Sequence, residues 1–379
     1  MDFGFSDEQE AFRETLRRFL EEKSPSAEVF RLMESESGYD PAVWKQMGEE
    51  LGLHGVAIPE AYGGQGFGFL ELGIALEEMG RVLLCAPFFS SACLAASAVL
   101  AAASEAQKAE LLPGIASGGT IAALAVAEPG GGWEPESITL EARRDGDAWV
   151  LDGAKAWVLD GHVADLVVVA ARLPGSAGAE GLCLLAVRGD APGLAAAPLA
   201  TLDPTRKQAS LRFQGVRAEL LGEPGAAGPA LARTLDRAAS GLAAEMTGGA
   251  ERCLESAVAY ARERRQFGRP IGSFQAIKHK VAEVLLEVES ARSAAWWACW
   301  AAAEDNEQRS EAAHLAKALC ADAYLQAAAE NIQVHGGIGV TWEADPHLHY
   351  RRARVSQTLF GDSAHHRARL AARLGLGAP

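Results

Sequence analysis

The first third of the chain places its hydrophobic residues at helical spacing. Phenylalanine and leucine at positions 5, 12, 16, 19 and 20 fall at helical spacing, and residues 6–9 (SDEQ) have the form of an N-terminal capping box. Pro41 suits the first turn of another helix, where its missing N–H is not needed. The pattern predicts a helical domain over residues 1–120, with later helices at 69–83, 90–103 and 106–112.

The pattern changes near residue 120. Short apolar runs follow, separated by Asp-Gly and Pro-Gly turn signals. Regularly spaced short strands with such turns predict a small antiparallel β-barrel or sandwich over residues 121–227. Strands are expected at 121–127, 138–142, 148–151, 156–159, 166–170, 183–187, 194–198, 208–213 and 218–221.

Helical spacing returns after residue 227. A long helix is predicted to run to an arginine-rich bend, where Gly268 and Pro270 stop it. Ser273 and Ser310 stand where they would cap the next two helices. The predicted fold class is therefore α+β: a helical domain, a β domain and a C-terminal bundle of four or five helices over 228–379.

Composition and charge narrow the class of function. The chain is 49% hydrophobic and 22% charged, as in ordinary globular proteins, and its net charge of −15 argues against nucleic acid as a partner. Six scattered cysteines without a C-x-x-C pair predict reduced thiols and no metal site. There is no basic-then-apolar leader and no run long enough to span a membrane, so we expect a cytoplasmic protein.

The bend gathers Arg262, Arg264 and Arg265 on this acidic chain. One explanation is a solvated helix end, whose cations oppose the negative pole of the helix dipole. The other is an anion site, because guanidinium groups pair with phosphate through two parallel hydrogen bonds. The bend alone leaves both explanations open.

Two motifs near the bend resemble the acyl-CoA dehydrogenase family. The first motif is R-x-x-F-G-x-P-I-x-x-F-Q, formed by Arg264, Phe267, Gly268, Pro270, Ile271, Phe274 and Gln275. The second motif is QVHGGIGVTWE at residues 333–343. The resemblance covers nearly the whole chain. It implies an FAD enzyme in which a carboxylate removes the α proton of an acyl-CoA thioester while the β hydride passes to the flavin.

The resemblance also implies cofactor contacts. Arg264 would pair with the FAD pyrophosphate, and the second motif would approach the cofactor through Gln333, Gly336 and Gly337, although a plain helix C-cap also explains the glycine pair. The adenosine side would be lined by Phe267, Ile271, Phe274 and Gln275. In this family these groups reach a flavin seated mainly on the neighbouring subunit. A homo-oligomer (dimer or tetramer) or a hetero-oligomer with a homologous subunit is implied, with an electron-transfer flavoprotein as electron acceptor.

The flavin-ring half of the site departs from the family pattern. Ala127 stands where the family has a hydroxyl residue before Glu-Pro, and Leu159 stands where it has a threonine near the flavin N5. Trp157 can pack against the flavin ring or belong to the core of the β domain. Ala127 and Trp157 are expected at the cofactor.

The usual catalytic glutamate is missing. Phe360 occupies its position, and Ala238 occupies the second family position for this base. Glu245 lies in an apolar run of the long helix, where burial could raise its pKa toward that of a base; the alternative is a structural glutamate paired with an arginine. Asp362 is the other candidate, and it is also placed to cap the last helix.

Three hypotheses follow for the function. The first is FAD-dependent α,β-dehydrogenation of an acyl-CoA thioester by an enzyme with a displaced base. The second is a flavin-poor partner subunit of a hetero-oligomeric acyl-CoA dehydrogenase, whose homologue supplies the ring site and the base. The third is a non-catalytic acyl-CoA-binding homologue. The acyl group and its carrier, CoA or acyl carrier protein, stay open.

Overall fold

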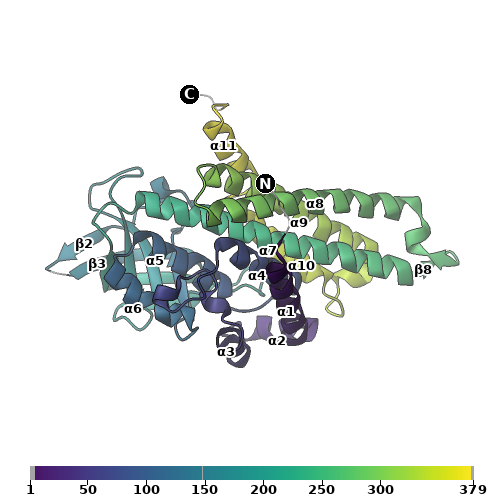
Figure 1. Cartoon of the computed structure of the whole chain (residues 1–379), viewed down its shortest axis with the longest axis horizontal. Helices are drawn as coiled ribbons and strands as arrows, with labels where there is room; N and C mark the ends of the chain where they lie inside the picture. Colours follow the sequence, from purple (N-terminus) through teal and green to yellow (C-terminus); the bar gives the residue numbers. More distant parts are fainter. Residues whose placement is uncertain (1–4, 147, 377–379) are drawn as a thin grey trace. The chain divides into compact units, whose positions relative to one another are not determined.

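The computed structural model describes residues 5–146 and 148–376 (Figure 1). These residues form two compact units. One unit contains residues 5–31, 69–84 and 239–376, and the other contains residues 32–68 and 85–238. No helix among the described residues is long and apolar enough to cross a membrane.

The first unit is built from helices. Helices α8 and α9 pack along each other, and α10 and α11 both contact α9 (Figure 1). The long helix α7 belongs to this unit from Ala239 onward. The bounds are α1 (Asp7–Lys23), α4 (Phe69–Arg81), α7 (Gly228–Glu263), α8 (Gln275–Ala303), α9 (Arg309–His335), α10 (Pro346–Thr358) and α11 (Ser363–Arg373), with α2 (Ser26–Glu34) at the unit boundary.

Two glycines let α4 and α7 approach closely. A Cβ atom built on Gly248 of α7 would lie 1.8 Å from the carbonyl oxygen of Glu77, and one on Gly80 of α4 would lie 2.0 Å from that of Glu245. No real side chain tolerates such distances, so only glycine fits at these positions. The crossing buries the side chains of Glu77 and Glu78 in the unit.

Arginines compensate these two buried carboxylates. The Arg292 Nη1 lies 2.5 Å from Glu77, and Arg17 donates two hydrogen bonds to Glu78, at 2.7 and 2.8 Å. Burial raises the pKa of Glu77, and the nearby Arg13 and Arg292 oppose that rise. The charges therefore tie α1, α4 and α8 together.

The second unit contains a seven-stranded sheet in the order β1-β4-β5-β7-β3-β2, with β6 also paired to β7. Its strands are β1 (Ala122–Ala125), β2 (Ala142–Asp145), β3 (Ala148–Leu159), β4 (Leu166–Arg172), β5 (Leu182–Arg188), β6 (Leu194–Pro198) and β7 (Gln208–Leu221). The pairs are antiparallel except β1 with β4, which is parallel. The α+β class is confirmed, but the sheet is mixed rather than wholly antiparallel. The helices of this unit include α3 (Pro41–Glu49), α5 (Ala96–Ala102), α6 (Glu105–Ala116), the π-helix η3 (Phe89–Ala95) and the start of α7.

Two pairs of predicted short strands are in fact single long strands. The segments 148–151 and 156–159 form β3, and 208–213 and 218–221 form β7. The Asp-Gly signal at 152–153 marks a β-bulge rather than a turn, because the register with β7 shifts there and resumes. The strand predicted at 138–142 begins only at Ala142.

The capping predictions were partly right. Ser6 and Gln9 form the predicted capping box, and Pro41 occupies the first turn of α3. Ser273 does not cap α8, since its hydroxyl donates to the Pro270 carbonyl and Phe274 holds the N-cap position. Ser310 lies inside α9, which begins at Arg309. Each of the six cysteines is a buried free thiol.

We expect Gly248→Ala to lower the free energy of unfolding by about 1–3 kcal/mol, because the added methyl group must push α7 away from α4. Urea denaturation would measure the change. Gly131→Ala is the matched control: its built Cβ meets nothing nearer than 3.5 Å, and a change within about 0.5 kcal/mol is expected. Equal stability of the two variants would contradict the close approach.

Candidate functional site

The arginine bend is a hairpin. Helix α7 ends at Glu263, and the chain reverses through β8 (Arg265–Gln266) and β9 (Arg269–Pro270). Phe267 and Gly268 form the turn with positive φ values of 51° and 77°, the pattern of a tight two-residue hairpin turn. The Phe267 side chain is 91% exposed, and Arg264 and Gln275 are exposed as well. Three predicted ligand-binding residues are thus exposed, whereas Ile271 and Phe274 are half-buried.

The structure brings the two sequence motifs together. Helix α9 ends at His335, whose ring stacks on Tyr260 of α7 at 4.2 Å between centroids. Val334 packs with Ala257 and Ala261 of α7 and with Ile271 of the bend. The second motif therefore lies against the base of the hairpin.

The glycine pair after α9 has two roles. Gly336 is the C-cap, with φ 67°, and its N–H donates to the Ile332 carbonyl, so the helix-cap explanation holds for this residue. Gly337 has no neighbour within 4 Å of a built Cβ, and neither has Gly336. Packing within the chain does not require glycine at 337. The open space beside it fits a cofactor that approaches the backbone.

Ala127 and Trp157 lie close together in the other unit. The Ala127 carbonyl accepts the N–H of Ala156, at 2.9 Å, and Ala127 is buried. Trp157 has a positive φ of 57° and a side chain that is 45% exposed, so it is not enclosed in the core. A bulky residue in this strained conformation is a feature that clusters at ligand sites.

A buried ion pair fixes the backbone beside these two residues. The Lys155 Nζ lies 2.9 Å from Glu128 and 2.7 Å from the Val126 carbonyl oxygen. Glu128 also accepts the backbone N–H groups of Thr139 and Leu140. Burial lowers the pKa of Lys155 to about 8, against the opposing effect of Glu128. The pKa of Glu128 is lowered, because Lys155 and the hydrogen bonds outweigh its burial.

An open pocket of about 440 Å³ adjoins this pair. Glu128, Pro129 and Thr139 line one part, and the exposed pair Arg143–Asp152, at 2.8 Å, lines another. The pocket has room for part of a ligand next to the segment that carries Ala127.

Both candidate bases have structural partners. Glu245 is 5% exposed and lies 2.8 Å from the Nη1 of Arg352, as in the structural alternative. Asp362 is exposed and caps α11 by accepting the N–H of His365 at 2.8 Å. Phe360 and Ala238, the two positions where the resemblance leads us to expect a base, are both buried. A catalytic role of Glu245 or Asp362 stays a prediction.

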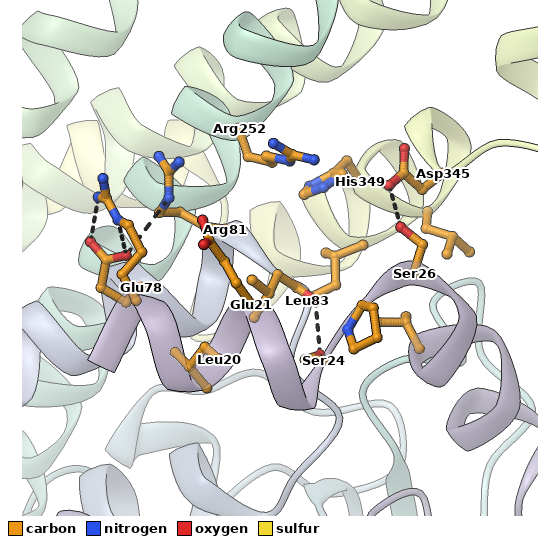
Figure 2. A pocket seen from close by; sticks show the side chains of 15 residues that line it. Leu20, Glu21, Ser24, Ser26, Glu78, Arg81, Leu83, Arg252, Asp345 and His349 are labelled. Atoms are coloured by element: carbon orange, nitrogen blue, oxygen red, sulfur yellow. Dashed lines mark hydrogen bonds and ion pairs between the residues drawn. The ribbon is translucent and has the colours of Figure 1, made fainter. Parts of the chain in front are cut away.

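A second pocket, of about 200 Å³, lies among α1, α2, α4, α7 and α10 (Figure 2). Arg17 binds Glu78 on one side, and Ser26 donates to Asp345, at 2.6 Å, on the other. Arg252 and His349 also line it. No residue predicted from the sequence lines this pocket, because its wall is assembled from five separate helices.

Sequence reasoning also missed two buried lysines. Lys155 lies two residues before Trp157, and Lys317 lies within the apolar run AAHLAKALCADA of α9. A lysine amid such a run is the signal that could have found Lys317, since lysine is almost never fully buried without a partner.

The sequence matches the acyl-CoA dehydrogenase N-terminal domain over residues 6–119, the middle domain over 123–216 and the C-terminal domain over 229–375. It is 35% identical to acyl-CoA dehydrogenase IpdE2 of Mycobacterium tuberculosis over 93% of each chain. It is 33% identical to the mitochondrial short-chain specific acyl-CoA dehydrogenase of Bos taurus, over 93% of this chain and 86% of the relative.

Solved structures are similar over the full length. A complex of glutaryl-coenzyme A dehydrogenase with glutaryl-CoA has a TM-score of 0.93 at 29% identity, covering 99% of this chain and 97% of that one. The ChsE4-ChsE5 complex of M. tuberculosis has a TM-score of 0.89 at 25% identity, covering all of both chains.

We expect Glu128→Gln to destabilise the protein by about 3–5 kcal/mol, because it leaves the Lys155 ammonium buried without a counterion. Urea denaturation at pH 7 would measure this loss. Adding Lys155→Met should recover much of it, since the uncompensated charge is then gone. A double variant no more stable than Glu128→Gln alone would show that the ion pair is not the cause.

Proposed function

Since the chain belongs to the acyl-CoA dehydrogenase family, we propose that it oxidises the Cα–Cβ bond of an acyl-CoA thioester with FAD held between two subunits. The family consists of FAD-dependent oxidoreductases that act on CH–CH groups, and this assignment is favoured over a non-catalytic acyl-CoA-binding homologue.

The observation that carries the proposal is the joining of the two motifs at the outward-facing hairpin. Tyr260 and His335 hold them in contact, and open space lies beside Gly337. These features fit the ADP half of FAD: Arg264 offers a guanidinium to the pyrophosphate, and the exposed backbone at Gly337 admits close approach. The adenosine would lie against Phe267, Ile271, Phe274 and Gln275, with Gln333 near the second motif.

The flavin ring is assigned to Ala127 and the half-exposed Trp157, whose indole offers a flat apolar surface. FAD, when bound, supplies the hydride acceptor. The backbone beside Ala127 is held because the Lys155 ammonium donates to the Val126 carbonyl oxygen and pairs with the Glu128 carboxylate. The residues of this chain thus bind and orient the cofactor; electrons are proposed to leave to an electron-transfer flavoprotein.

The α proton still needs a base. Glu245 would have to leave Arg352, and Asp362 would have to leave the end of α11. These contacts favour structural roles for both carboxylates.

A second candidate function follows from that observation: the chain works as one subunit of a hetero-oligomer, and a homologous subunit supplies the base. The ChsE4-ChsE5 complex, which contains two differently named chains, supports the pairing with an unlike subunit. Alanine at 127, leucine at 159 and phenylalanine at 360 agree with it.

The flavin content of the purified chain separates the two arrangements. About one FAD per chain means a self-sufficient homo-oligomer, and little FAD that is restored by a co-expressed homologue means a hetero-oligomer. In whichever assembly binds FAD, Arg264→Gln is expected to weaken binding about 10- to 100-fold, because a charge-assisted hydrogen bond to the pyrophosphate is lost. Arg262→Gln, on the same bend, is the control. Equal affinity of both variants would remove Arg264 from the cofactor site.

Glu245→Gln tests the displaced base. Because glutamine cannot accept the α proton, a catalytic Glu245 would make turnover of butyryl-CoA or longer acyl-CoA fall by about 100-fold or more. From its pairing with Arg352 we expect a loss of stability and a kcat within about threefold of the parent. Anaerobic bleaching of the flavin would report turnover, and thermal denaturation would report stability.

A further inference from the structure

Lys317 of α9 is fully buried, with an exposed fraction of 0%. Its Nζ donates to the carbonyl oxygens of Gln357, at 3.0 Å, and Gly361, at 2.8 Å. Among the described residues it forms no ion pair within 4 Å. Burial lowers its pKa to about 7. An amine kept in such a place for stability alone is unfavourable, since an apolar side chain of similar size would avoid the cost of desolvation.

Lys317 binds one carbonyl in the last turn of α10 and one in the connection that follows it. Helix α10 ends at Thr358 and α11 begins at Ser363. Between them, Phe360 has a φ of 59° and Gly361 a φ of 105°. Gly361 adopts its φ freely, but a bulky residue such as Phe360 keeps a positive φ only where the surroundings hold it, and such strain gathers at functional sites.

A histidine holds a further carbonyl of this turn. The His366 Nε2 lies 3.1 Å from the Phe360 carbonyl oxygen, which can only accept, so Nε2 carries the hydrogen. Burial lowers the pKa of His366, which keeps the ring neutral. Its Nδ1 then accepts a hydrogen bond from the Nδ1–H of His314, at 2.9 Å. The carbonyls of Gln357, Phe360 and Gly361 are thereby fixed by buried nitrogen donors.

We propose that Lys317 is a positioning residue: together with His366 it fixes the backbone of the Phe360–Gly361 turn, so that the turn forms one unmoving wall of the substrate site. This inference rests on the proposed function, because the family resemblance puts this turn beside the substrate. Phe360 cannot take a proton, so the turn contributes shape rather than acid–base chemistry. A shift of the turn would displace the thioester relative to the flavin, and reaction rates fall steeply with such misplacement.

The test compares Lys317→Met, which keeps the length of the side chain and removes the donors, with Lys317→Gln, which restores N–H donors without the charge. We expect Lys317→Met to lower kcat about 10- to 100-fold while KM changes little and thermal stability is kept or raised. Lys317→Gln should recover most of the kcat. Lys45→Met, at an exposed position of α3, is the control. An unchanged kcat in Lys317→Met, or an equal loss in both variants, overturns the proposal.

Hydrogen exchange separates this proposal from the proposed function. The Gly361 N–H donates to the Thr358 carbonyl and reports the order of the turn. If neither the chain alone nor its complex with a homologous subunit oxidises butyryl-CoA or longer acyl-CoA, the proposed function fails. Exchange then decides the positioning role. Faster exchange over residues 359–362 in Lys317→Met, slowed again in Lys317→Gln, supports it, and unchanged exchange overturns it.

Discussion

The cost of burying a charge is the constraint on which much of this structure depends. Lys155 and Lys317 are both fully buried, and each donates a hydrogen bond to a backbone carbonyl next to a proposed site segment. Glu77 and Glu78 are buried where α4 crosses α7, and arginines from other helices meet them. A buried charge that loses its partners is costly, so these contacts favour one arrangement of the backbone and of the packing around each charge.

Local patterns predicted the fold well and its details less well. Helical spacing located the long helices, because burial of one face is recorded in the sequence itself. The Asp-Gly pair at 152–153 signals a turn locally, but pairing with β7 on both sides carries β3 straight through it. Ser273 and Ser310 failed as caps because the chain enters α8 and α9 through other turns. The domain boundaries near 120 and 227 stay predictions.

The candidate site shows the same division. Its motif residues could be named from the sequence, yet the stacking of Tyr260 on His335 that joins the motifs could not. Likewise, the apolar run around Glu245 suggests a base, whereas its hydrogen bond to Arg352, which is distant in the sequence, is visible only in the structure. Spacing in the sequence identifies the residues of a site, whereas tertiary packing decides which partners set their charge. The role proposed for Lys317 depends on such partners, which the sequence does not reveal.

The burial of the six cysteines makes the reactivity of their thiols a measure of how often the protein opens. All are buried, and burial raises the pKa of Cys253 and of Cys320, so the reactive thiolate form is scarce in the native protein. Alkylating reagents and oxidants therefore meet these sulfurs only when the chain opens. Thiol labelling becomes a clock for opening in each unit, because Cys253, Cys299 and Cys320 lie in one and Cys85, Cys93 and Cys183 lie in the other. Because each unit contains three of the buried cysteines, a thiol reagent can report the opening of each unit separately.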